Sequence, residues 1–347
     1  FDYNAVKLTL SNENILEWTA LDVSEDEAVN ICDTHSLNLD LASDLDMIER
    51  IRDEAIVYLK EEFKFPIPAP LQKASLPELL QFAGKLSSRH RQLGACTLLK
   101  AMHVINHFDA GEARSALKVT DQELFKDAEN RIYRVISSMM AKGLPVVEFM
   151  GGRKQRASMV TKLLSKDDPL AAQLFDKMRF RIVTATKEDI IPTINYLTKK
   201  LFPFNYILSG ETYNTILPIH NYMVKGNDIE TINPGTIYDI PASRDSSTGL
   251  PVWNQHSSPK YRVIHWVADM PVRIRDYENA YITDGINPVP RPVIYIRTEF
   301  QILDRHTNRQ NESGEASHKK YKYRQVDSVL KKLKVKRPKE ETAEKTL

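Results

Sequence analysis

Hydrophobic positions in the first part of the chain repeat at helical spacing. Over residues 43–62, apolar side chains recur every three or four positions, as expected for one buried face of a helix. The segment 65–70 ends this helix, because its three prolines remove backbone donors and restrict the residues before them. Similar periodicity predicts helices over about 77–108 and 121–142. We therefore expect a helical N-terminal domain over residues 1–145.

The pattern changes from residue 146 onward, where short β-like runs alternate with helical segments. The runs lie at 146–149, 180–184, 261–267 and 293–303. This mixture predicts an α+β fold, with helices flanking one mixed β-sheet, in a second domain over about 146–326.

Two stretches of the second domain are rich in loop-forming residues. The stretches, about 205–258 and 269–291, contain many Asn, Ser, Thr, Gly and Pro residues and predict insertions. The lysine-rich segment 327–347 predicts a basic, disordered tail, since such ends are often solvated.

Composition narrows the class of protein. The hydrophobic share of 42% and the charged share of 27% are typical of a globular protein. No apolar run approaches the roughly 20 residues of a membrane helix, and the first residues show no signal-peptide pattern. Cys32 and Cys96 are too few for a disulfide framework. We expect a cytoplasmic location and no membrane partner. Residue 1 is not Met, so the possibility of a leader segment before it stays open.

The distribution of charge says more than the net charge of +2. Acidic residues gather at 25–46, whereas basic residues gather at 153–166, 177–181 and 331–339. Basic clusters in a chain of mixed charge suit phosphate-rich ligands, either nucleotides or nucleic acids. A solvated basic surface is the alternative.

Two short patterns carry candidate phosphate chemistry. Glu299 and Gln301 alternate in a β-like run, so both side chains lie on one face of a sheet. Asp176 precedes another β-like run that contains Arg179 and Arg181. A carboxylate can bind magnesium and arginines can neutralise phosphate, although a surface ion pair would give the second pattern as well.

A third pattern is a glycine pair followed by basic residues. After positions 151–152 come Arg153, Lys154, Arg156 and Lys162. Backbone amides and cations placed this way can approach phosphate oxygens. A basic helix start at the surface is the alternative interpretation.

Four blocks in this order resemble the RelA/SpoT-type alarmone synthetases, which make (p)ppGpp. Residues 147–162 resemble that family's pattern I-E-F-x-x-G-R-x-K-x-x-x-S-I-x-x-K, residues 176–182 its D-L-x-A-x-R-I, and residues 259–265 its P-K-x-N-G-Y-x-S-I-H. Residues 299–322 match its E-x-Q-I strand and the following G-x-A-A-H-W-x-Y-K segment without a gap. The first block is one residue short, so either Lys154 or Arg156 fills its second basic place.

The resemblance implies a five-stranded mixed sheet related to nucleotidyltransferases. It also implies that ATP donates its β,γ-pyrophosphate to the ribose 3′-hydroxyl of GDP or GTP, with Mg²⁺ required. Asp176 and Glu299 would hold the metal, or Glu299 would act as the base on the acceptor hydroxyl. The implied phosphate-binding residues are Arg153, Lys154, Lys162, Arg179 and Arg181. On the acceptor side, Tyr261 would stack on the base, with Lys260, His265, Gln301 and His318 as further contacts.

The departures from the family pattern lie on the acceptor side. The Asn-Gly pair before Tyr261 is missing, and the basic segment ahead of it is replaced. The acceptor could therefore be an adenine nucleotide or an RNA 3′ end, with RNA the less favoured partner. A nucleotide-binding regulator without activity and a homo-oligomer also stay open. His103 and His107 stand four residues apart and could bind zinc, but such a pair is more often structural.

Overall fold

A computed structural model describes most of the chain. The described residues are 18, 21–84, 87–117, 120–153, 155–165, 178–208, 211–217, 222–225, 228–231, 258, 260–274 and 293–334. Among these, no helix is both long enough and apolar enough to span a bilayer.

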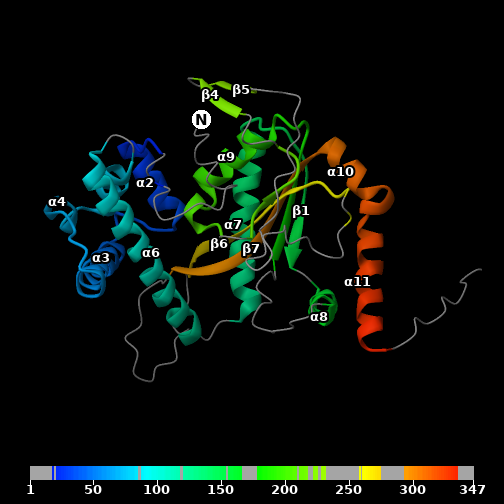
Figure 1. The fold of residues 1–347 in the computed structure, drawn as a ribbon, viewed down its shortest axis with the longest axis horizontal. Helices are drawn as coiled ribbons and strands as arrows, with labels where there is room; N and C mark the ends of the chain where they lie inside the picture. Colours follow the sequence, from blue (N-terminus) through cyan, green and yellow to red (C-terminus); the bar gives the residue numbers. More distant parts are fainter. Residues whose placement is uncertain are drawn as a thin grey trace, which may run out of the picture.

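A five-stranded mixed sheet forms the centre of the fold (Figure 1). Its strands, in spatial order, are β1 (Val146–Arg153), β2 (Met178–Thr184), β7 (Val293–Asp304), β6 (Ile264–Arg273) and β3 (Tyr213–Asn214). The β2–β7 pair is parallel, whereas the other pairs are antiparallel. A small ribbon consists of β4 (Tyr222–Lys225) and β5 (Asp228–Thr231). Three of the four predicted β-like runs lie within strands, and the fourth, 261–267, overlaps β6 from residue 264 onward. The mixed sheet flanked by helices is confirmed.

Helices lie on both sides of the sheet and at both of its ends. Their bounds are α2 (Glu25–Thr34), α3 (Ala42–Phe63), α4 (Ala69–Gln72), α5 (Leu76–Ala83), α6 (Arg89–Ala116), α7 (Asp121–Ala141), α8 (Arg156–Ser165), α9 (Ile190–Lys200), α10 (Arg305–Glu312) and α11 (His318–Lys332), with the 3₁₀ turns η3 (Phe204–Tyr206) and η5 (Gly314–Ala316). In Figure 1, α2 to α6 lie at one end of the molecule and α11 at the other.

Three boundary predictions were wrong. The insertion predicted over about 269–291 begins too early, because β6 continues to Arg273. The helix predicted over 77–108 is two helices, because α5 ends at Ala83 and α6 begins at Arg89. A side chain at Gly84, the cap of α5, would press against the carbonyl oxygen of Leu21. The predicted tail over 327–347 begins too early, because α11 continues to Lys332. Val329 is buried where α11 packs against α8, and Lys332 donates a hydrogen bond to the carbonyl oxygen of Ser165 at 2.8 Å.

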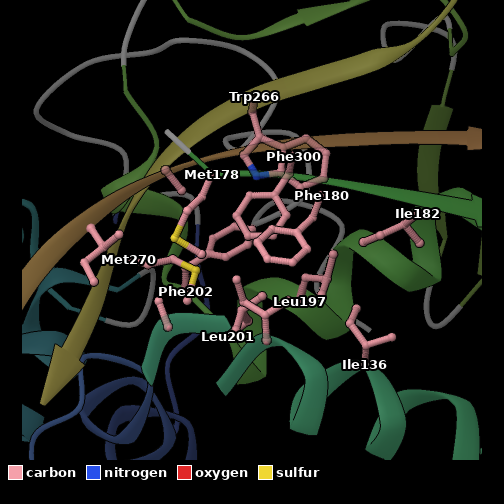
Figure 2. Packing of buried hydrophobic residues seen from close by; sticks show 14 of the residues in the cluster. Ile136, Met178, Phe180, Ile182, Leu197, Leu201, Phe202, Trp266, Met270 and Phe300 are labelled. Carbon is pink, nitrogen blue, oxygen red and sulfur yellow. The ribbon is translucent and has the colours of Figure 1, made fainter. Parts of the chain in front are cut away.

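One face of the sheet is apolar and packs against α7 and α9. Phe180 of β2, Phe300 of β7 and Trp266 of β6 are neighbours in register and are fully buried (Figure 2). A side chain at Gly151 of β1 would meet the Phe180 ring at 2.3 Å, so this close approach needs glycine. Helix α7, which the sequence places in the N-terminal helical domain, shares this core with the strands. The division of the chain at residue 145 stays a prediction.

The N-terminal half of β7 faces α6 through a cluster of rings. The His107 ring stacks on the Tyr295 ring with centroids 4.0 Å apart, and His103 packs edge-on against Tyr206. The Tyr206 and Tyr295 hydroxyls are 3.1 Å apart, and Asn106 donates a hydrogen bond to Tyr295. His103 and His107, which the sequence offered as a weak zinc candidate, are therefore part of an aromatic interface between α6, η3 and β7.

A buried ion pair joins helix α3 to the C-terminal end of β6. Arg273 pairs with Asp44 of α3 and also donates to the carbonyl oxygen of Ser36 at 3.0 Å. Arg131 of α7 donates to the carbonyl oxygen of Thr34 at 2.8 Å and to that of Pro271 in β6. These contacts tie α2, α3 and α7 to one strand.

We predict that mild acid destabilises this fold. Burial lowers the pKa of His35 to about 4 and that of His103 to about 2, so both are neutral in the folded chain at pH 7. The unfolded chain binds protons near its ordinary histidine pKa, about 6.5. Stability should thus be complete above that pH and fall as the pH drops from there toward 4.

Denaturant titrations at several pH values would measure this effect. His103→Leu should flatten the slope by up to about 1.4 kcal/mol per pH unit, the value for one proton. His90→Leu, at an exposed position of α6, should leave the slope unchanged. A wild-type unfolding free energy that stayed constant from pH 7 to 5 would contradict the prediction.

Candidate active site

The face of the sheet opposite the aromatic core carries a polar cluster. The parallel register of β2 and β7 places Arg179 beside Glu299 and Arg181 beside Gln301. Antiparallel pairing with β6 adds His265 next to Gln301. Since alternate residues of a strand share a face, all five side chains project away from the buried rings.

Glu299 is the buried centre of this cluster, with 3% of its surface exposed. Its Oε1 lies 2.9 Å from Arg179 Nε and 3.4 Å from His265 Nε2. The same oxygen accepts a hydrogen bond from Gln301 Nε2 at 3.0 Å. A buried carboxylate is tolerated when donors and cations surround it in this way.

Arg181 is held by partners from several elements. Its Nε and Nη2 donate to the Gln301 side-chain oxygen at 3.2 and 3.1 Å, and Nη2 also donates to the Tyr261 hydroxyl at 3.1 Å. Nη1 donates to Asn308 Oδ1 at 3.4 Å, and Glu312 lies 3.7 Å from the same nitrogen. The planar guanidinium is therefore fixed in orientation, as phosphate recognition by arginine requires.

Two tyrosines border the cluster. Burial raises the pKa of Tyr261, while nearby Arg181 opposes that rise. The ring of Tyr213 on β3 lies against the His265 ring, with centroids 5.3 Å apart, and burial also raises its pKa. Sequence reasoning missed Tyr213, because only the pairing of β3 with β6 brings it here.

Helices α10 and α11 complete the cluster from the other end of β7. Asn308 donates to Glu148 Oε2 at 3.1 Å, which links α10 to β1. The pKa of His318, at the start of α11, is lowered by burial and by Lys322, with Arg179 and Arg181 contributing. Sequence reasoning also missed Asn308, Glu148 and Glu312. Glu148 lies in the family-like block 147–162, and the other two lie in the block 299–322. Their position in these blocks is the one sequence signal that could have pointed to them.

The predicted site residues thus fall into three groups. Those that meet around Glu299 are Arg179, Arg181, Tyr261, His265 and Gln301, whereas His318 is exposed and lies near the two arginines rather than at Glu299. Lys260 is exposed beside Tyr261, whereas Arg153 turns toward α7, where it lies 3.4 Å from Glu129. Asp176 and Lys154 lie outside the described residues, and Lys162 lies in α8 with no described side chain.

The described residues fit magnesium as a partial ligand set. No group of three or more His, Cys, Asp or Glu side chains that could enclose a metal occurs among them. Magnesium, however, is usually bound by one or two carboxylates, with phosphates and water filling its other positions. Glu299 offers hard carboxylate oxygens for such a shared site, and in this arrangement Arg179 and Gln301 engage its Oε1.

Comparison with solved structures finds nucleotide-metabolising proteins of low similarity. Small alarmone synthetase 2 from Bacillus subtilis is 18% identical with a TM-score of 0.30, and the match covers 61% of this chain and 78% of that one. Small alarmone synthetase 1 from the same organism, bound to its product pppGpp, is 15% identical with a TM-score of 0.31 and coverages of 64% and 87%. A GTP pyrophosphokinase family protein from Streptococcus pneumoniae is 16% identical with a TM-score of 0.31 and coverages of 62% and 90%. No family model and no curated protein matches the chain.

We predict that Arg181→Met weakens the fold as well as the site. The change removes the donors to the Gln301 side-chain oxygen, and leaving a buried acceptor unsatisfied costs roughly 1–3 kcal/mol. Chemical denaturation would measure the loss. Arg305→Met, at an exposed position of α10, should change stability by less than about 0.5 kcal/mol. Equal losses in the two variants would show that the Arg181 contacts add nothing.

Proposed function

We propose that this chain is a RelA/SpoT-type pyrophosphokinase that transfers the β,γ-pyrophosphate of ATP to the 3′-hydroxyl of a nucleotide, GDP or GTP in the first place. One observation carries the proposal. Glu299, Arg181 and Tyr261 come from three family-like blocks that are far apart in sequence, yet they meet on one polar face of the sheet. Such convergence is what a shared site for two nucleotides requires.

The proposed reaction moves one group and one proton. The acceptor 3′-oxygen forms a bond to the β-phosphorus of ATP, and the bond from that phosphorus to the α,β-bridging oxygen breaks. AMP leaves with the bridging oxygen, and the proton of the 3′-hydroxyl passes to water, or to Glu299 if that carboxylate acts as the base. Because such transfer depends mainly on positioning and on neutralising phosphate charge, fixed cations matter more than a strong nucleophile.

The described residues divide between these tasks. Arg181 and Arg179 would neutralise the triphosphate, and the Tyr261 ring would stack on the acceptor base, an interaction worth roughly 1–3 kcal/mol per base. Lys154 and Lys162 are proposed to bind ATP phosphates as well. Arg153 could join them only by leaving Glu129.

Magnesium would be held by Glu299 together with Asp176. When bound, it would offset the negative charge that develops on the phosphates during transfer. In the described arrangement Arg179 pairs with Glu299 Oε1, the oxygen that also accepts from Gln301. We therefore expect the Arg179 side chain to move from this oxygen toward the phosphates when the nucleotide binds.

Incubation of the chain with magnesium and β- or γ-labelled ATP tests the proposal. GDP, GTP, ADP and bulk tRNA would be supplied separately as acceptors, and the products resolved. Label on one acceptor with an equal amount of AMP would establish the transfer and name the substrate. Nucleotide binding without transfer to any acceptor would instead favour the regulator.

We predict that Glu299→Gln abolishes transfer, with a loss of at least about 100-fold in kcat, the scale of removing an acid–base group. The amide keeps the size of the side chain, so the fold should persist. Asp176→Asn should act in the same direction through magnesium. Glu49→Gln, at an exposed position of α3, is the matched control. Near-normal transfer by Glu299→Gln would remove Glu299 from the mechanism.

We predict that Tyr261→Ala raises the KM of the acceptor about 10-fold or more, because it removes one stacking surface. Tyr261→Phe keeps that surface and should change the acceptor KM far less. Steady-state kinetics with each substrate varied in turn would separate the two sites. A rise in the KM of ATP alone would move Tyr261 to the donor side.

A further inference from the structure

Within the described part of the chain, the segment that carries Tyr261 belongs to no strand ladder. Residues 260–263 precede β6 and form no ladder, so their backbone groups need other partners. The Tyr261 amide donates to the carbonyl oxygen of Ser258 at 2.9 Å. The two amides that follow donate to side chains rather than to backbone.

Asn311 of α10 satisfies both backbone groups of Arg262. Its Oδ1 accepts from the Arg262 amide at 3.0 Å, and its Nδ2 donates to the Arg262 carbonyl oxygen at 2.6 Å. Asn311 is 3% exposed, so water cannot readily replace these bonds. A buried amide placed in this way imitates the strand neighbour that the segment lacks.

Thr215 holds the next residue from the opposite side. Its hydroxyl accepts from the Val263 amide at 2.8 Å, and its own amide donates to the Val263 carbonyl oxygen at 3.1 Å. The peptides after Tyr261 are thus clamped between α10 and the segment that follows β3. The Tyr261 hydroxyl accepts from Arg181, while its ring packs beside the buried cluster of Val183, Val263 and Leu303.

We propose that Asn311 is a positioning residue for the acceptor nucleotide, acting through the backbone of the Tyr261 segment. This inference rests on the proposed acceptor role of Tyr261. Asn311 touches neither Glu299 nor Arg181 by any described hydrogen bond, so its effect should fall on the acceptor and spare the donor. A side chain that fixes a ligand-binding group from behind typically changes affinity about 10- to 100-fold, by analogy with the outer partners of metal ligands.

The test combines a structural measurement with a binding measurement. In Asn311→Ala, the Arg262 amide should exchange with solvent at least about 10-fold faster by NMR, because its acceptor is gone. GDP should bind about 10-fold more weakly by calorimetry, while a non-hydrolysable ATP analogue binds as it does to the wild type. Gln310→Ala, at the adjacent exposed position of α10, should change none of these quantities.

A second variant guards against poor folding of the first. Thr215→Val keeps the shape of the side chain and removes the hydroxyl that accepts from Val263. It should produce the same acceptor-specific loss, with faster exchange at the Val263 amide.

The outcomes separate the two hypotheses. Unchanged exchange in both variants, or a loss of affinity for the ATP analogue as large as that for GDP, would overturn the role of Asn311. A wild-type chain that binds neither nucleotide would overturn the proposed function and the acceptor role with it. Faster Arg262 exchange would then still establish the clamp as a structural device.

Discussion

The parallel pairing of β2 with β7 is the constraint on which the rest of the molecule depends. Phe180 and Phe300 lie in register on the apolar face, and the same register sets Arg181 beside Gln301 on the other. A slip of one residue would carry every side chain of a strand to the opposite face. Burial of the aromatic core therefore constrains the polar cluster, because a one-residue slip would expose the rings. The chemistry of one face is positioned by the packing of the other.

The same polar face also joins the helical region to the candidate site. Tyr295, Arg297, Glu299 and Gln301 alternate along β7 and share that face. Tyr295 packs against α6, Arg297 pairs with Asp269 of β6 at 2.9 Å, and Glu299 begins the polar cluster. The same face of β7 thus contacts α6 at Tyr295 and carries the buried carboxylate at Glu299. The N-terminal helices therefore pack against the strand that holds the candidate site.

Much of this arrangement can be predicted from local pattern, and the remainder depends on contacts between distant segments. The period of two in a strand is enough to place Glu299 and Gln301 on one face, and β-like runs locate four of the strands. Tyr213 could not be found in this way, since it lies in a loop-rich stretch and reaches the site only through pairing with β6. Asn308 and Asn311 have no chemical pattern in sequence; their roles come from where α10 packs. Arg153 shows the opposite case, a family-like residue that the structure turns toward α7.

The most direct test of the account is a crystal structure of the chain with magnesium and a non-hydrolysable ATP analogue. The account predicts the triphosphate on the polar face of β2 and β7, with Arg181 on its oxygens and Glu299 at the metal. A nucleotide bound elsewhere, with the Arg179–Glu299 pair and the Arg181 contacts unchanged, would contradict the assignment of this face as the catalytic site.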